Sequence, residues 1–297
     1  MKKSNLMNVM ADKVGLTKPI KRTLLTVSLA CTAFTHTVQA DLLEEIKAKG
    51  EIVIATEARY APFEMLEDGK IVGYGKDILD EILKDLPGVK LTQLDLPFQG
   101  ILSGLSAKRY DFVATTLTIS KNRMTKYAFT YPISTASLAI LKRKGDKRIT
   151  SAKDMAGMTL GIQGGSEQLG AIKIYEKAEL SKKGYKNIKK FTDYNEAYTA
   201  LASRRVDIVP QALPNLAAVV KKRPDIFEIV QPVFGPDAYY AWIGRKDSES
   251  ATLVQFFSDG IEKLHKSGKL TELQMKWFGF TMDFPTGYIP TPADKEL

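Results

Sequence analysis

Cysteine, histidine and tryptophan are scarce in this sequence. Its 297 residues include one cysteine, two histidines and two tryptophans. A single cysteine excludes a framework of disulfides, and two histidines leave too few ligands for a histidine-rich metal site. The hydrophobic share of 44% excludes an intrinsically disordered chain. We therefore expect a globular protein with one large domain or two smaller ones, and with no metal or other cofactor.

The first forty residues have the pattern of a secretory signal peptide. Basic side chains come first, a short apolar stretch follows, and Ala40 ends a segment with the small residues of a cleavage site. The alternative is a lipoprotein signal that ends at Cys31, although Ser28 stands where such a signal prefers leucine. We expect residues 1–40 to be removed on export to a bacterial periplasm.

Most of the excess positive charge belongs to this segment. The whole chain has 43 Lys and Arg against 34 Asp and Glu, a formal charge of +9. Without residues 1–40, 37 basic and 33 acidic residues remain, a charge of +4. No basic cluster interleaved with aromatic residues is left, so we expect no nucleic-acid partner. The cysteine also lies in this segment, which excludes thiol catalysis by the mature chain.

Helices and strands alternate along the rest of the sequence. Apolar residues recur at helical spacing in some segments and form short runs in others. Predicted helices are 41–50, 76–86, 100–108, 167–176 and 195–203, and predicted strands are 52–55, 89–94, 112–114, 159–162, 188–191 and 206–209. This alternation is typical of an α/β fold with mainly parallel sheets flanked by helices.

One helix–turn–strand segment recurs 96 residues later. Leu105–Leu117 aligns with Leu201–Leu213, with Arg, Asp and Val also at matching places. Chance similarity is the alternative. The alignment makes Thr116 and Ala212 equivalent, each just past the carboxyl end of a predicted strand. Ligands of open α/β sheets bind there, so two such ends facing each other would form a cleft.

Two segments have the features of an anion site. Gly164-Gly165-Ser166 precedes a predicted helix, where its hydroxyl and backbone N–H groups can cap the helix or hold a carboxylate. Arg123 lies in the first turn of another predicted helix, which is unfavourable for a cation unless it meets an anion. Arginine can hold a carboxylate through two parallel hydrogen bonds. A plain helix cap and a surface arginine are the alternatives.

These motifs together resemble one family. They are Tyr60–Glu64, Asp68–Ile78, Asp111–Arg123, Phe129–Pro132, Gly161–Ser166 and Ile261–Phe278. In this order they resemble the extracellular solute-binding proteins of family 3, the periplasmic polar-amino-acid-binding components of ABC importers. The resemblance covers nearly the whole mature chain.

The resemblance implies a two-lobed periplasmic binding protein fold (type II), with a ligand in the interlobe cleft. Lobe 1 would comprise residues 41–134 and 241–297, and lobe 2 residues 135–240, joined by hinge strands at 134–138 and 239–243. Hinge closure would bury a small ligand. Membrane permease subunits in the inner membrane would recognise the closed state, and we expect the binding protein to be a monomer.

The resemblance also implies a set of ligand-binding residues. Tyr60 and Phe98 would be pocket walls, and Arg123 would pair with the ligand's α-carboxylate. Other polar or charged contacts would come from Glu57, Thr116, Thr118, Gly165 and Ser166.

Ala212 departs from the pattern of this family, which usually has an aspartate there to receive the α-ammonium. A buried ammonium without a carboxylate partner is costly. Either the ligand lacks a standard α-ammonium or another residue replaces the aspartate, and Glu167, Asp237 and Gln211 are candidates. We expect the ligand to be a small carboxylate, an amino acid or a derivative of one.

Two other functions stay open. A few relatives of this fold are periplasmic dehydratases that act on ring carboxylates, and Glu167 beside the anion site could serve as acid or base. A sensory role would require the chain to carry its ligand to a membrane receptor. The leading prediction is a binding protein without catalytic activity.

Overall fold

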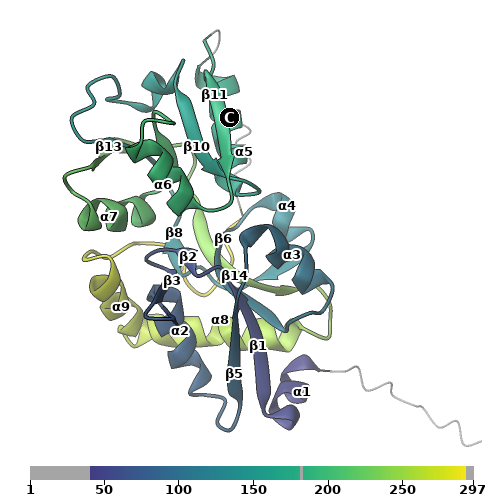
Figure 1. Cartoon of the computed structure of the whole chain (residues 1–297). Helices are drawn as coiled ribbons and strands as arrows, with labels where there is room; N and C mark the ends of the chain where they lie inside the picture. Colours follow the sequence, from purple (N-terminus) through teal and green to yellow (C-terminus); the bar gives the residue numbers. More distant parts are fainter. Residues whose placement is uncertain (1–40, 181–182, 292–297) are drawn as a thin grey trace, which may run out of the picture. The chain divides into compact units, whose positions relative to one another are not determined.

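The computed structural model describes residues 41–180 and 183–291 (Figure 1). The predicted signal peptide, residues 1–40, lies outside this part of the chain. Within the described residues, no helix is both long and apolar enough to cross a lipid bilayer.

The described chain contains both predicted kinds of element. The α-helices are α1 Leu42–Lys49, α2 Tyr74–Leu83, α3 Phe98–Ser106, α4 Lys121–Met124, α5 Glu167–Glu179, α6 Tyr194–Ala202, α7 Leu213–Lys222, α8 Ala251–Lys266 and α9 Lys269–Trp277. The strands are β1 Glu51–Thr56, β2 Arg59–Tyr60, β3 Glu64–Glu67, β4 Lys70–Val72, β5 Lys90–Asp95, β6 Phe112–Thr118, β7 Tyr127–Phe129, β8 Ser134–Thr135, β9 Leu138–Arg143, β10 Thr159–Gln163, β11 Asn187–Phe191, β12 Val209–Ala212, β13 Phe227–Phe234 and β14 Tyr239–Arg245.

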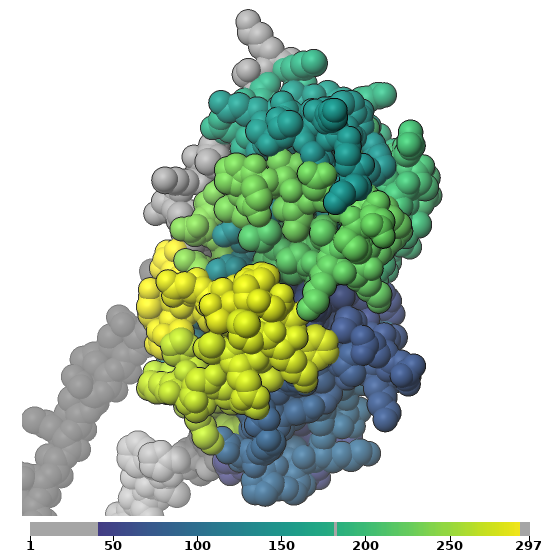
Figure 2. Space-filling view, turned by 90° about the vertical axis from the view of Figure 1, so that its left-hand side faces the viewer, coloured from purple at the N-terminus to yellow at the C-terminus, as the bar shows by residue number. Residues whose placement is uncertain are grey.

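Lobe 1 is built on a six-stranded sheet of order β5-β1-β6-β14-β7, with β8 paired to β14. Strands β5, β1 and β6 are parallel, whereas β14 is antiparallel to its neighbours. Its core includes Phe112, Trp242 and Phe257, and the rings of Phe112 and Phe257 stack 4.2 Å apart. Helix α9 contacts α2 and α8, and Figure 2 shows the C-terminal part of the chain, in yellow, at the surface.

Lobe 2 contains a parallel pair, β10-β11, and an antiparallel sheet of order β12-β9-β13. A parallel bridge between Leu160 and Ile208 links the two. Helices α5, α6 and α7 contact these strands. The predicted α/β architecture with flanking helices is confirmed, and the sheets are mixed, because β9 and β14 run antiparallel to their neighbours.

The chain crosses between the two sheet systems twice. Strand β8 still pairs with β14 in lobe 1, whereas β9 begins three residues later in lobe 2. The return lies between the end of β13 at Phe234 and the start of β14 at Tyr239. This second crossing therefore precedes the predicted hinge strand 239–243, since Tyr239 and Tyr240 already pair with β8.

The repeated segment forms the same local structure in both lobes. In lobe 1, the backbone N–H of Val53 donates to the Asp111 carboxylate over 2.7 Å. In lobe 2, the N–H of Thr159 donates to Asp207 over 2.9 Å. Lys108 and Arg204, again 96 positions apart, both have a left-handed backbone, with φ of 54° and 62°. The recurrence therefore marks a shared helix–turn–strand unit.

Two predicted strands differ from the structure by three or more residues at an end. The strand expected at 206–209 forms instead at 209–212, where it pairs with β9. The strand expected at 112–114 extends to Thr118, because β14 pairs with this part of β6. Thr116 therefore lies within β6 rather than beyond its end, while Ala212 ends β12.

Candidate functional site

Seven of the nine predicted binding residues line one small cavity between the lobes. They are Glu57, Tyr60, Phe98, Thr116, Thr118, Arg123 and Ser166. The cavity measures about 10 Å³, which is room for about one water molecule. The two lobes thus contact each other closely around these side chains.

Arg123 is the buried cation of this cavity. Helix α4 positions it, because the Ser120 hydroxyl caps the helix by accepting from the Arg123 N–H over 3.3 Å. Its guanidinium donates to the carbonyl oxygens of Thr118 at 3.2 Å and Gly165 at 3.5 Å. Its Nε lies 3.3 Å from Oε1 of Glu167. Burial lowers the pKa of Arg123, while the Glu167 carboxylate favours its charged form.

Phe98 and Ser166 also line the cavity. The Phe98 ring, at the first residue of α3, lies 5.7 Å from the Arg123 guanidinium carbon, a cation–π distance. The Ser166 hydroxyl caps α5 by accepting from the Leu169 N–H, and it donates to the Gln163 carbonyl over 2.9 Å. The predicted N-cap is confirmed. Gly165 lies outside the cavity wall, and only its carbonyl reaches Arg123.

Two buried glutamates belong to lobe 1. Glu57 follows β1, and its Oε1 accepts a 2.6 Å hydrogen bond from the Gln163 side chain of lobe 2. Burial raises the pKa of Glu57 to about 8. Glu64 is fully buried and accepts from the Thr116 hydroxyl over 2.9 Å, and burial holds its pKa well above the usual range. At neutral pH the Glu57 carboxyl is therefore mainly protonated.

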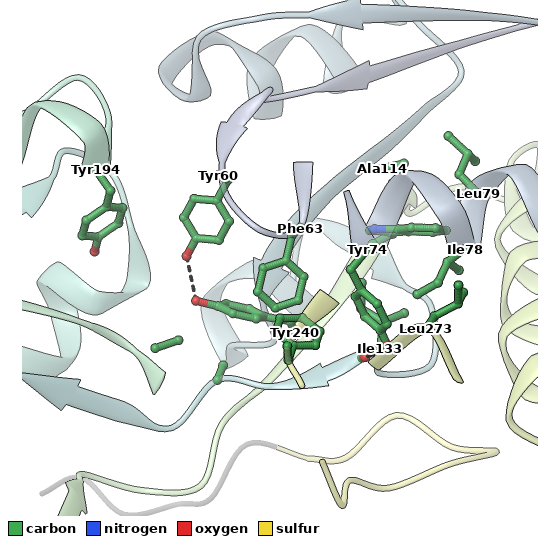
Figure 3. Close-up of a cluster of buried hydrophobic side chains, with 14 of the residues drawn as sticks. Tyr60, Phe63, Tyr74, Ile78, Leu79, Ala114, Ile133, Tyr194, Tyr240 and Leu273 are labelled. Carbon is green, nitrogen blue, oxygen red and sulfur yellow. Dashed lines mark hydrogen bonds between the residues drawn. The ribbon is translucent and has the colours of Figure 1, made fainter. Parts of the chain in front are cut away.

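A cluster of neutral polar groups also lies at the cavity, and its members Tyr60, Gln168 and Tyr240 line it. The hydroxyls of Tyr60 and Tyr240 lie 2.7 Å apart (Figure 3). Gln168, from lobe 2, donates to Tyr240 at 2.9 Å and to Oε1 of Gln211 at 3.0 Å. Burial raises the pKa of both tyrosines well above 10, so the hydroxyls stay protonated.

Ala212 is fully buried but does not line the cavity. It ends β12 and precedes α7, and its N–H donates to Oε1 of Gln211 over 2.7 Å. The amide nitrogen of Gln211 is buried without a hydrogen-bond partner among the described residues. The polar group next to Ala212 is thus a neutral amide.

Of the three candidate substitutes for an acid at Ala212, Glu167 and Asp237 border the same groove, whereas Gln211 does not. Glu167 pairs with Arg123, and Gln211 belongs to the tyrosine cluster. Asp237 borders a groove of about 240 Å³, which we call the α5 groove. It shares Thr118 and Gln168 with the cavity, and it is lined by Thr118, Lys121, Glu167, Gly170, Ala171 and Asp237 among others.

Sequence reasoning missed three cavity residues, Gln163, Gln168 and Tyr240. Gln163 ends β10, so the preference of ligands for strand ends could have identified it. Gln168 and Tyr240 carry no comparable signal, since each lies inside an element whose orientation only the fold decides.

The site offers a buried guanidinium, hydroxyl and amide groups, and aromatic walls. Such a set can hold a carboxylate and the polar groups next to it. Within the described residues, no group of three His, Cys, Asp or Glu side chains is placed to hold a metal ion.

Comparisons with known proteins agree with this architecture. The L-cystine-binding protein TcyJ of Escherichia coli (strain K12) is 28% identical over 242 residues, which cover 80% of this chain and 86% of that protein. The structure of an ancestral arginine-binding protein bound to arginine is 31% identical with a TM-score of 0.69, and covers 77% of this chain and 99% of that one. The ancestral amino acid-binding protein AncCDT-1, a precursor of cyclohexadienyl dehydratase, is 27% identical with a TM-score of 0.70 over 80% of this chain and 99% of that one.

These likenesses confirm the two-lobed periplasmic binding protein fold and a solute-binding role. The sequence pattern that defines the bacterial extracellular solute-binding proteins of family 3 matches residues 52–280. This match spans both lobes and every cavity residue described above. The chain therefore belongs to the bacterial extracellular solute-binding proteins, family 3.

Proposed function

We propose that this protein binds a small carboxylate, an amino acid or a derivative of one, in the periplasm and delivers it to the permease subunits of an ABC importer. The observation that carries the proposal is Arg123, a residue that is 5% exposed and whose guanidinium lies where the two lobes meet. It contacts Thr118 of lobe 1 and Gly165 of lobe 2. An anion bound to it would hold both lobes together and stabilise the closed state.

The lobes would move as two bodies, 41–134 with 241–297 against 135–240. The short crossings after β8 and after β13 support this division, because few residues need to change conformation there. The protein would act as a monomer, after removal of residues 1–40. Small-angle scattering with and without ligand would measure closure, and the mass of the exported protein would locate the cleavage site.

The test combines a ligand screen with one substitution. A thermal-shift screen of amino acids, opines, keto acids and ring carboxylates identifies the ligand, because binding raises stability by mass action. Arg123→Ala should then weaken calorimetric affinity at least tenfold, the loss of a charge-assisted pair worth roughly 1.5–3 kcal/mol. The control is Arg109→Ala, which removes an exposed arginine. Unchanged affinity of the Arg123 variant would refute the assignment.

A periplasmic dehydratase acting on a ring carboxylate is the second candidate. It is favoured by Glu57, a protonated carboxyl at the cavity wall that could donate a proton, and by the likeness to the dehydratase precursor. Incubation with prephenate or arogenate decides this question. Absence of product would remove the candidate.

A further inference from the structure

Each of the three nitrogens of the Arg123 guanidinium already lies against an oxygen of the protein. Its two terminal nitrogens donate to the Thr118 and Gly165 carbonyls, and its Nε faces Glu167 at 3.3 Å. The carbonyls belong to the backbone, whereas Glu167 is a side chain that can move. A ligand carboxylate that forms two parallel hydrogen bonds with Nε and a terminal nitrogen of Arg123 must therefore take the place of Glu167.

Glu167 is also the accessible carboxylate at this site. Its side chain is 30% exposed, and it borders the α5 groove of about 240 Å³, so it has space in which to turn. Glu57 accepts a hydrogen bond from Gln163 and Glu64 accepts one from Thr116, and both glutamates are buried. Of these three glutamates, Glu167 alone combines exposure to water with direct contact to Arg123.

The surroundings of Ala212 are unsuited to a cation. The Gln211 side chain lies next to Ala212, and its amide oxygen already accepts from the Ala212 N–H and from Gln168. Its buried amide nitrogen lacks an acceptor among the described residues. A free N–H donor favours an acceptor atom and repels an ammonium group.

We propose that Glu167 is the ammonium acceptor of this site, and that the ligand is a zwitterionic α-amino acid inserted into the Arg123–Glu167 ion pair. This inference rests on the proposed function, because it assumes a carboxylate on Arg123. In an α-amino acid one carbon separates the two charged groups, so the ammonium lies within a few ångströms of the guanidinium. Glu167 is already at that distance from Arg123.

Insertion keeps every charge paired. The ligand carboxylate replaces Glu167 on Arg123, and the ligand ammonium replaces Arg123 on Glu167. A carboxylate without an amine would instead separate Glu167 from its partner and place a second negative charge beside it, which is unfavourable in a partly buried site. Glu167 therefore selects amino acids over their amine-free analogues.

The test measures by calorimetry how Glu167→Gln changes the affinities of two matched ligands. The probes are the tightest binder among the twenty amino acids and cystine, and its amine-free analogue; for L-arginine this is 5-guanidinopentanoate. In Glu167→Gln the amino acid should bind at least tenfold more weakly, and the analogue equally well or more tightly. Glu179→Gln makes the same charge change at the exposed far end of α5 and should alter neither affinity. Glu167→Asp, which keeps a carboxylate, should retain the preference for the amino acid.

Several outcomes would overturn the inference. They are equal effects of Glu167→Gln on both probes, no effect on the amino acid, or a wild-type protein that binds only amine-free carboxylates. In the last case binding that still depends on Arg123 would leave the proposed function intact. Failure of every amino acid and carboxylate to bind would overturn both. A melting curve of each variant verifies that it is folded.

Discussion

The hydroxyl oxygens of Tyr60 and Tyr240 lie 2.7 Å apart in the buried region between the lobes (Figure 3). Tyr60 belongs to the small β2-β3-β4 sheet, whereas Tyr240 lies just after the second crossing between the lobes. Gln168 of lobe 2 donates to both hydroxyls. Hydrogen bonds of this pair therefore connect Tyr60, a predicted pocket wall, with the start of β14 and with helix α5.

Tyr240→Phe should lower the free energy of unfolding by about 1–2 kcal/mol. The substitution removes a buried hydroxyl and leaves the Tyr60 hydroxyl and the Gln168 amide with one partner fewer. Urea denaturation measures the change. Tyr288→Phe, at a side chain that is 58% exposed, is the control and should change little. Equal stability of both variants would contradict the coupling described here.

Glu57 should make stability fall as pH rises. Its pKa is about 8 in the folded protein and near 4.5 in an unfolded chain. Between these values the folded state keeps a proton that the unfolded state loses, so stability declines by up to about 1.4 kcal/mol per pH unit and levels off above pH 8. Urea denaturation at several pH values should show a smaller decline in Glu57→Gln.

The Glu57→Gln comparison isolates one carboxyl. Glu64, whose pKa is raised in the same direction, is present in both proteins. Glutamine also keeps an oxygen that can accept from Gln163. Identical pH profiles for the two proteins would show that Glu57 is not buried in the neutral form.

Gly104→Ala should destabilise the protein by roughly 1–3 kcal/mol, the usual cost of an overpacked core. A Cβ atom at Gly104 would lie 2.8 Å from Cζ of Tyr110, a buried side chain that cannot easily move. Gly100→Ala in the same helix meets open space, and should stabilise by roughly 0.5–1 kcal/mol through helix propensity. Thermal melting measures the stability of the two variants. Equal effects would contradict the close packing of Gly104 against Tyr110.

The repeated aspartates should contribute to stability in the same way in both lobes. Asp111→Ala and Asp207→Ala each leave a strand N–H, of Val53 or Thr159, without its acceptor. We expect a loss of roughly 1–3 kcal/mol for each. Asp111→Asn keeps an acceptor oxygen and should retain most of the stability. If Asp111→Ala left the stability unchanged, the N–H of Val53 would donate to water instead.

Much of the local structure could be predicted from the sequence. Asp41 and Gly50 bound α1 as a polar N-cap and a left-handed C-cap, and Ser120 caps α4 as a polar N-cap. The recurrence of Arg and Asp after 96 residues correctly indicated a shared unit. These features depend on neighbours within a few positions, so the order of residues is sufficient to reveal them.

The pairing of the strands was harder to predict from the sequence. Strand β12 begins three residues later than predicted, because its pairing with β9 rather than its own composition sets its limits. In the same way β6 extends to Thr118 because β14 lies beside it. Pairing partners far away in the chain leave no local pattern.

The sequence by itself determined which residues could meet an anion, namely Arg123 at a helix start and Ser166 at a helix cap. Only the tertiary structure decided what surrounds them. It placed Glu167 against Arg123, Gln163 against Glu57 and Tyr240 against Tyr60. Periodicity and capping act over a few residues, whereas burial, pairing of charges and the resulting pKa of Glu57 arise where distant segments meet.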